Sequence, residues 1–377
     1  IKPRNDMLKY LTIFSYMLIA LFLTNCASGP SSVEFTSAKT KARSERNLKD
    51  AENYALQALS LEAHAQDAQV PYFLATEIYK PQKNWTKVVE MFDEAMKRDP
   101  EAMLLQPLMY NNEPIYKMQD QINIYYKNEL WFILFNKAVK IYEDDLTDPE
   151  IINLLELAMY VDPNNVKAYI LLATTYNIND NLNAAKELIN NALRLESLQV
   201  EEKARLCSIL AEFYKQENNY SDGIDSYMQA YDFYKSIDDT DGVMSSMVGI
   251  LGLNLLLEDW LKSIQWAEKI YEDFYLVSEE NEIDILFNIS LAYNNAASSY
   301  YNVAGEVFNS DNPTRAALQE SMNNYNIAFE YFDIARDFFM ELEDMGSENG
   351  ASMAIQVKDY MDLIEDTQIP FVQKQLD

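Results

Sequence analysis

The sequence predicts an all-α protein built as an α-solenoid of paired helices. Its 377 residues include only 8 Gly and 11 Pro, and 49% are hydrophobic, so the chain can form long helices around a large core. Apolar residues recur at intervals of three and four, the spacing of one helix face. The pattern itself returns about every 34 residues, which is typical of helical repeats. Since one such repeat cannot bury its apolar face alone, neighbouring copies are expected to stack.

The clearest copy runs from Asn165 to Ser197, where a polar turn separates two amphipathic helices. Apolar residues share one face of each helix: Tyr169, Leu172, Ala173 and Tyr176 on the first, and Ala185, Ile189 and Ala192 on the second. Alanines at these positions let two helix backbones approach closely, and the larger side chains fill the space beside them. We interpret both stripes as core.

This copy resembles a tetratricopeptide repeat (TPR), a helix–turn–helix unit of 34 residues. Four other segments fit the same template at Leu74, Ala75, Tyr79, Val88, Phe92, Ala95 and Pro100; at Phe135, Ala138, Val139, Tyr142, Leu155, Ala158 and Pro163; at Cys207, Leu210, Ala211, Tyr214, Gly223, Tyr227 and Ala230; and at Met247, Ile250, Leu251, Asn254, Trp260, Ala267 and Ile270. Asn254, Ser197 and Ile270 depart from the usual Tyr, Pro and Ala. The resemblance implies a right-handed superhelix whose inner face receives peptides.

The first residues resemble a bacterial lipoprotein signal peptide. Lys9 precedes an apolar run from Tyr10 to Thr24, which is short for a membrane-spanning helix but matches the apolar region of a secretory signal. The tetrad that ends at Cys26 resembles a lipobox, and this implies cleavage before Cys26 and lipid attachment to its thiol. The alternative is an uncleaved signal anchor with an incidental cysteine. Translation is expected to start at Met7, and Ala27 in place of Asp favours the outer membrane, facing the periplasm.

The expected organisation has seven parts. These are a signal peptide over 1–26, a flexible tether over 27–35, TPR-like helices over 36–101, an irregular insertion over 102–131, a TPR array over 132–277, a long helix pair over 278–345, and a C-terminal capping helix and tail over 346–377. In the insertion, Pro107 and Pro114 predict a loop before a further helix. The long helices are expected over 283–308 and 313–342, and the last helix over 351–366. We interpret Gly249 and Gly252 as packing positions inside an apolar helix.

The composition argues against metal sites, nucleotide-binding loops and histidine-based catalysis. The chain has one histidine, His64, no Gly-rich phosphate loop, and an acidic turn at Asp238–Gly242 whose spacing does not fit a calcium loop. We therefore expect no metal, no cofactor and no enzymatic activity; a carboxylate-based hydrolase is the least favoured alternative. Residues 238–377 carry 27 acidic against 6 basic side chains, and this argues against nucleic acid as a partner.

With catalysis not expected, we expect the protein to act by binding a partner. The TPR resemblance places candidate groove residues on the first helix of successive copies. They are Asn136 and Lys140; Lys167, Ile170, Thr174 and Asn177; and Arg205, Glu212 and Lys215. Four cations in a groove of a protein with net charge −30 suit a carboxylate or an acidic segment. Thr174 and Glu212 replace the Asn that the chaperone-tail clamp of some TPR proteins needs, so that activity is not expected.

The sequence thus predicts a lipid-anchored scaffold that binds another protein or peptide and reaches the membrane through acylated Cys26. It is similar in plan to the TPR lipoprotein subunit of the outer-membrane β-barrel assembly machinery. The alternative is a surface lipoprotein that captures a nutrient, like the starch-binding lipoproteins, in which the segment from Leu104 to Tyr126 would supply the binding loop.

Overall fold

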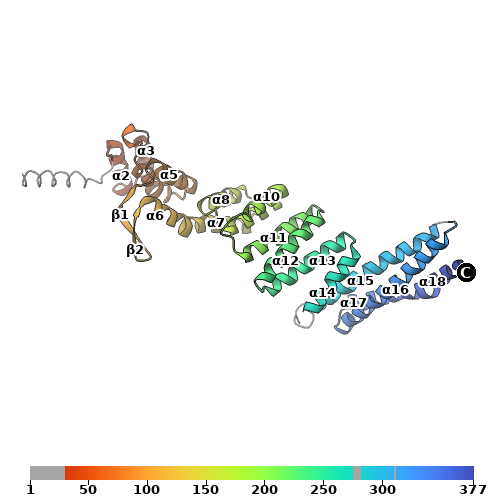
Figure 1. The fold of residues 1–377 in the computed structure, drawn as a ribbon. Coiled ribbons are helices and arrows are strands. Elements are labelled where there is room, and N and C mark those ends of the chain that lie inside the picture. The colour runs from red at the N-terminus through yellow and green to blue at the C-terminus, as the bar shows by residue number, and fades with distance from the viewer. Residues whose placement is uncertain (1–29, 275–281, 310) are drawn as a thin grey trace, which may run out of the picture. The chain divides into compact units, whose positions relative to one another are not determined.

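The computed structural model describes residues 30–274, 282–309 and 311–377 and divides the chain into two compact units, 1–179 and 180–377 (Figure 1). The predicted signal peptide and Cys26 lie outside the described residues. No helix of the described residues is both long and apolar enough to span a bilayer.

Unit 1 is a set of short helices interrupted by one β-hairpin. Its elements are α2 (Val33–Arg43), α3 (Leu48–Leu59), the 3₁₀ helix η1 (Glu62–His64), α4 (Gln69–Phe73), the π-helix η2 (Leu74–Tyr79), α5 (Trp85–Arg98), β1 (Met103–Tyr110), β2 (Glu113–Lys117), α6 (Met118–Tyr125), the π-helix η3 (Tyr126–Leu130), α7 (Trp131–Asp144), α8 (Pro149–Val161) and α9 (Val166–Ile178).

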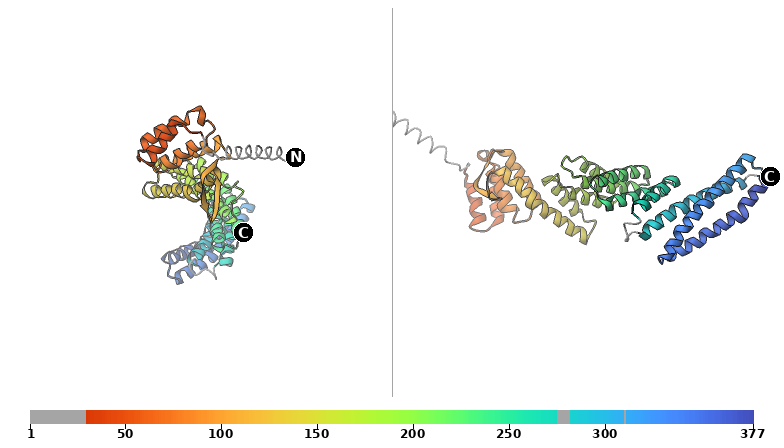
Figure 2. Two further views of the ribbon diagram at one scale, coloured as in Figure 1. Left: turned by 90° about the vertical axis from the view of Figure 1, so that its left-hand side faces the viewer. Right: turned by 60° about the horizontal axis from the view of Figure 1, so that its bottom comes forward.

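Unit 2 contains longer helices. Its elements are α10 (Leu182–Ala192), α11 (Val200–Gln216), α12 (Tyr220–Ser236), α13 (Thr240–Leu256), α14 (Trp260–Phe274), α15 (Glu282–Gly305), the 3₁₀ helix η4 (Glu306–Asn309), α16 (Arg315–Asp344), α17 (Glu348–Leu363), the π-helix η5 (Ile364–Gln368) and α18 (Ile369–Leu376). From α10 to α17 each α-helix packs against the next, and α18 returns to α16 (Figure 2).

Short polar side chains start the helices. Asn47, Asn84 and Asn165 accept hydrogen bonds from backbone N–H groups in the first turns of α3, α5 and α9. These groups have no partner inside the helix, so each cap satisfies one of them. Asp239 and Thr314 do the same for α13 and α16.

Most residues of the predicted stripes lie in the core, whereas Phe135, Tyr142, Tyr176 and Tyr214 are half-buried. Alanine is fully or almost fully buried at the small-residue positions of the predicted copies: Ala75, Ala95, Ala138, Ala158, Ala173, Ala185, Ala192, Ala211, Ala230 and Ala267. Asn254, which departs from the template, is also buried, and its Nδ2 donates to the carbonyl oxygen of Ile250. The predicted all-α fold of stacked helical hairpins is confirmed, whereas the handedness of the superhelix stays a prediction.

The insertion was predicted as a loop, and this is wrong. β1 and β2 form an antiparallel hairpin in which Leu108 pairs with Ile115 and Met109 with Pro114. Asn111 and Asn112 connect the strands with φ of 50° and 65°. Two positive φ angles make the tight turn that suits the twist of a hairpin, and Asn tolerates them better than most residues. The helix expected after the loop is present, since α6, η3 and α7 follow one another directly.

Two further expectations need correction. Helix continues from α17 through η5 and α18 to Leu376, so the end of the chain is not an irregular tail. Gly249 is a packing position, because a Cβ there would lie 2.5 Å from Cζ of Tyr227. Gly252 is not, because a Cβ there would meet no heavy atom within 4 Å.

Several inter-helix turns use the left-handed backbone conformation without glycine. Lys83, Asp180, Asn218, Asp238 and Glu258 have φ between 56° and 59°. Lys83 lies four residues beyond the end of η2, and each of the others lies two residues beyond the end of a helix. A left-handed residue there lets the last carbonyl groups find hydrogen-bond donors.

Candidate binding surfaces

In unit 1 the predicted groove residues lie on α7 and α9. Asn136 and Lys140 are exposed on α7, and Lys167 is exposed on α9. The other α9 positions, Ile170, Thr174 and Asn177, are half-buried. Intervals of three and four place the four α9 residues on one face of the helix. Thr174 donates its hydroxyl hydrogen to the carbonyl oxygen of Ile170 at 2.9 Å, so this hydroxyl is already engaged.

In unit 2 the predicted residues lie on α11. Arg205, Glu212 and Lys215 are all exposed. Lys215 Nζ lies 3.6 Å from a carboxylate oxygen of Glu212, and the other oxygen of Glu212 accepts a hydrogen bond from the Tyr227 hydroxyl. Glu212 is therefore held by its own unit, and the positive charge of Lys215 is partly neutralised.

Three of the four predicted cations remain available. Among the described residues, carboxylates pair with Lys137 and Lys215 but with none of Lys140, Lys167 and Arg205. Lys140 and Lys167 belong to unit 1 and Arg205 to unit 2. A single continuous groove through all nine predicted residues stays a prediction.

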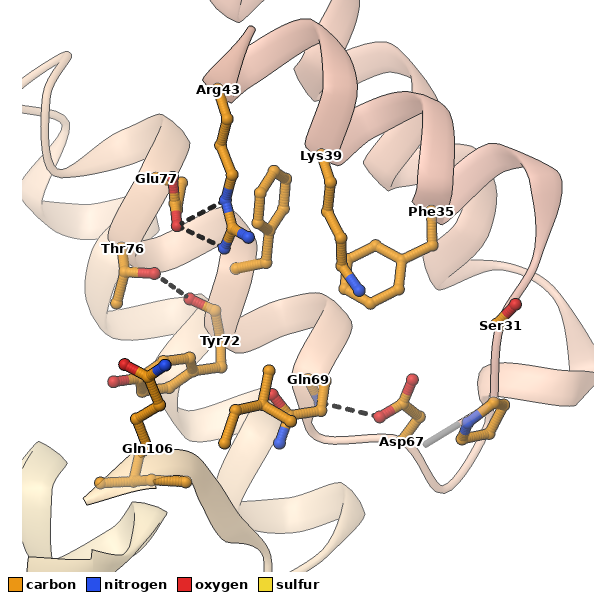
Figure 3. A pocket seen from close by; sticks show the side chains of 14 residues that line it. Ser31, Phe35, Lys39, Arg43, Asp67, Gln69, Tyr72, Thr76, Glu77 and Gln106 are labelled. Atoms are coloured by element: carbon orange, nitrogen blue, oxygen red, sulfur yellow. Dashed lines mark hydrogen bonds and ion pairs between the residues drawn. The ribbon is translucent and has the colours of Figure 1, made fainter. Parts of the chain in front are cut away.

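The structure also contains a cavity that the sequence did not predict. It lies within unit 1 and has a volume of about 520 Å³ (Figure 3). Three parts of the chain that are distant in sequence enclose it, and its lining residues are Pro30, Ser31, Phe35, Lys39, Arg43, Asp67, Gln69, Tyr72, Phe73, Thr76, Glu77, Leu104, Leu105 and Gln106. The spacing of Phe35, Lys39 and Arg43, four residues apart, was the available sequence signal, because it places them on one face of α2.

Cations lie over aromatic rings along one wall of this cavity. Lys39 Nζ is 3.8 Å from the ring centroid of Phe35, a distance at which a cation–π attraction operates. Arg43 forms an ion pair with Glu77 at 2.7 Å, and its Cζ is 6.0 Å from the ring centroid of Phe73. Lys39 and Arg43, two of the three basic residues of α2, thus make contacts inside unit 1.

Lys39 differs from Arg43 in lacking a carboxylate partner among the described residues. Burial, and secondly the positive charge of Arg43, lower the pKa of Lys39 below its usual range, while Asp67 acts in the opposite direction. An anion that entered the cavity would find this charge uncompensated.

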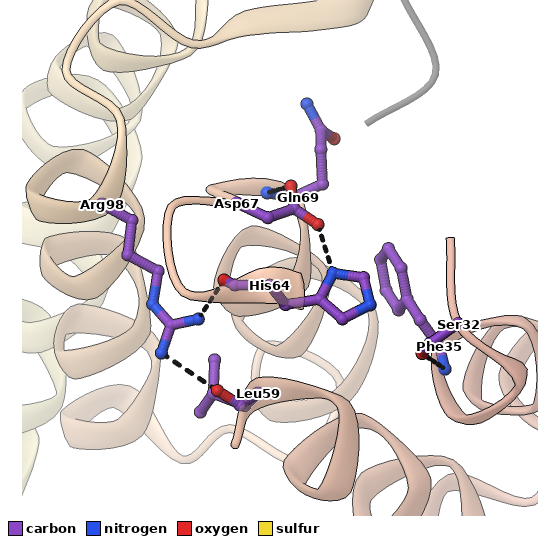
Figure 4. Close-up of polar contacts among 7 residues, drawn as sticks. All are labelled: Ser32, Phe35, Leu59, His64, Asp67, Gln69 and Arg98. Carbon is purple, nitrogen blue, oxygen red and sulfur yellow. Dashed lines mark hydrogen bonds and ion pairs between the residues drawn. The ribbon is translucent and has the colours of Figure 1, made fainter. Parts of the chain in front are cut away.

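Behind this wall lies a buried polar pair (Figure 4). His64 Nδ1 is 2.7 Å from Asp67 Oδ2, and Asp67 Oδ1 accepts a hydrogen bond from the backbone N–H of Gln69. The ring of Phe35 packs edge-on against His64. His64 Nε2 has no hydrogen-bond partner among the described residues. From the other side, Arg98 donates to the carbonyl oxygens of His64 and Leu59, which fixes the turn that carries the histidine.

Metal-binding clusters and the buried cysteine bear on the chemistry open to the described residues. The described residues contain no group of three or more His, Cys, Asp or Glu side chains placed to hold a metal ion. Cys207 is buried, and burial raises the pKa of its thiol to about 11, so it is a poor nucleophile at neutral pH. Solenoids of helical hairpins characteristically offer extended surfaces for binding.

Repeated helix pairs with buried alanines in the template positions identify the architecture. The fold is a solenoid of helical hairpins with the alanine spacing of tetratricopeptide repeats. A TPR protein from Parabacteroides merdae has 13% identity and a TM-score of 0.35, with 80% of this chain and 99% of that chain covered. PilF from Pseudomonas aeruginosa has 14% identity and a TM-score of 0.35, with coverages of 62% and 98%. YrrB, described as a TPR protein with an unusual peptide-binding site, has 14% identity and a TM-score of 0.30, with coverages of 58% and 97%. Neither a protein-family model nor a curated protein matches the chain.

Proposed function

We propose that this protein is a non-enzymatic, lipid-anchored scaffold of the bacterial cell envelope that binds another protein or peptide. The observation that supports this most directly is the set of exposed cations on first helices of the repeats. Lys140, Lys167 and Arg205 project into solvent without a carboxylate partner among the described residues, in a chain with net charge −30. Electrostatic complementarity would then favour an acidic segment of the partner.

The sequence supplies the membrane part of the proposal. Cys26 is proposed as the acylated first residue of the mature chain, with Ala27 favouring the outer membrane and a periplasmic orientation. Acyl chains provide strong membrane affinity when several are attached to one residue. No nucleic-acid partner is proposed, because the acidic C-terminal half has no basic stripe to replace phosphate counterions.

Charge reversal tests the groove. Lys167→Glu combined with Arg205→Glu is expected to weaken partner binding about tenfold or more, because two attractive charges become repulsive. The partner is first identified by crosslinking in cells and mass spectrometry on the full chain, and binding is then measured with the purified components. The matched control is Lys97→Glu combined with Lys374→Glu, which reverses one exposed, unpaired lysine in each unit away from the predicted groove.

The comparison of the two double variants decides the result. Equal affinity of the groove variant and the unsubstituted protein would remove the groove hypothesis. Equal weakening by both double variants would show a response to net charge alone.

Nutrient capture is the second candidate, and the cavity of unit 1 is the observation that favours it. Tyr72, Gln69 and Gln106 place an aromatic ring and two amide groups on its lining, next to the apolar side chains of β1. Stoichiometric saccharide binding by the full chain, lost in Tyr72→Ala and accompanied by no protein partner, would favour capture over the scaffold.

A further inference from the structure

The β1–β2 hairpin carries many apolar side chains that solvent reaches. Six large apolar residues between 103 and 117 are at least 37% exposed: Met103 52%, Leu105 65%, Leu108 42%, Met109 62%, Tyr110 37% and Tyr116 53%. Only Glu113 and Lys117 are charged in this segment. A concentration of exposed apolar side chains marks a surface that contacts something other than water.

The strand register separates the two faces of the hairpin. Met109 pairs with Pro114, and side chains alternate along a strand, so Met109, Pro114 and Tyr116 share one face. Tyr110 belongs to the opposite face, and its hydroxyl accepts a hydrogen bond from Asn128 Nδ2 of η3 at 2.9 Å. The face of Tyr110 therefore lies toward η3, and the face of Met109 and Tyr116 is the free one.

The N-terminal segment approaches the base of this hairpin. Pro30, the first described residue, lines the same cavity as Leu104 and Leu105 of β1. Cys26 precedes Pro30 by four residues, a span of at most about 14 Å when fully extended. An anchor at Cys26 would thus hold the base of β1 close to the bilayer surface. Lys39 of the same cavity, which has no carboxylate partner among the described residues, would attract anionic headgroups.

We propose that the hairpin is a membrane-contacting element that inserts Met109 and Tyr116 into the interfacial region of the bilayer. The proposal rests on the lipid anchor of the proposed function. Tyrosine favours the headgroup level, where its ring is shielded and its hydroxyl stays hydrated. A two-stranded hairpin has backbone N–H and C=O groups unpaired along its outer edges, and this confines it to the interface and keeps it out of the hydrocarbon core. The contact would hold unit 1 in a fixed orientation on the membrane.

A fluorescent label at Met109 tests this. The full chain carrying Met109→Cys is labelled with an environment-sensitive dye and mixed with vesicles of phosphatidylethanolamine and phosphatidylglycerol. Leu146→Cys is the matched control, an apolar side chain 44% exposed in the turn between α7 and α8. The unsubstituted chain serves as the blank for labelling at Cys207, since the Cys26 thiol carries the lipid in the proposed function. We expect vesicles to blue-shift the Met109 label, and lipids with a shallow nitroxide to quench it at least twofold more strongly than the Leu146 label.

The outcomes separate the hairpin from the anchor. Protein that floats with the vesicles while both labels respond equally would overturn the hairpin contact and leave the anchor standing. Protein that stays in the soluble fraction would overturn both proposals. A blue shift without vesicles that grows with protein concentration would show that the hairpin meets a second copy, and this also overturns the membrane contact. Met109→Asp should abolish the shift of a label at Tyr116→Cys with no change in the thermal midpoint, since both side chains are exposed.

Discussion

Gly249 and Gly252 lie about one turn apart on α13, and alanine is expected to have opposite effects at the two positions. In a helix, Gly→Ala contributes about 1 kcal/mol of stability through backbone entropy. At Gly252 nothing opposes this gain, because the added methyl group meets no heavy atom within 4 Å. Gly252→Ala should therefore raise the free energy of unfolding by about 1 kcal/mol.

At Gly249 the same methyl group would lie 2.5 Å from Cζ of Tyr227. This ring cannot move freely, because it is 6% exposed and its hydroxyl is bonded to Glu212. Overpacking of this kind costs about 1–3 kcal/mol, which equals or exceeds the helix gain. The two alanine variants should thus differ by about 1–3 kcal/mol, with Gly249→Ala the less stable.

Urea unfolding of the full chain, followed by far-ultraviolet circular dichroism, measures both variants. The reasoning fails if Gly249→Ala unfolds at the same urea concentration as Gly252→Ala, or at a higher one. A Tyr227→Leu background supplies the mechanistic control, because it removes the ring atoms that the added methyl group would meet. In this background Gly249→Ala should become neutral or stabilising; a persistent loss would assign the cost to something other than Tyr227.

Two further predictions concern the core of unit 2. Phe332 is fully buried and stacks on Tyr360, so Phe332→Ala should lower the free energy of unfolding by about 3–5 kcal/mol. Met340→Ala, on the exposed side of α16, should change the free energy of unfolding by about 0.5 kcal/mol or less. Similar urea midpoints for the two variants would contradict this prediction. Because burial raises the pKa of Cys207 to about 11, its thiol should react with a disulfide reagent at pH 8 about a hundredfold or more slowly in the folded chain than in urea. Mass spectrometry locates the modified cysteine, and equally fast modification in both states would refute the burial argument.

Much of the fold could be predicted because helical periodicity is a local signal. Ala173 and Ala185 could be placed in the core from spacing alone, since any helix that buries a stripe must bury those positions. The hairpin could not be predicted in the same way, because Pro107 and Pro114 were interpreted only as breakers. Pro is tolerated on the outer edge of a strand, and Asn111–Asn112 was the turn signal that could have indicated a hairpin.

For the candidate surfaces, too, the sequence predicts what depends on helix register and does not predict what depends on contacts between distant segments. Exposure of Lys140, Lys167 and Arg205 followed from helix register, which the repeat template provides. The cavity depends on three distant segments, which contribute Phe35, Tyr72 and Leu104 to its lining, and periodicity within one helix does not encode how such segments come together. Nor does periodicity predict which partner a side chain has, and the capture of Glu212 by Tyr227 became visible only from the packing of α11 and α12.

The non-glycine turns have a consequence for the stability of the repeats. A residue with a side chain costs roughly 1–2 kcal/mol in the left-handed conformation, and six inter-helix turns of the described residues adopt it, among them Asp180, Asn218 and Glu258. The folded chain therefore holds several kcal/mol of local strain at sites that lie away from its buried alanines. An engineer could release this strain one turn at a time with glycine, and so obtain a more robust scaffold whose binding faces remain untouched.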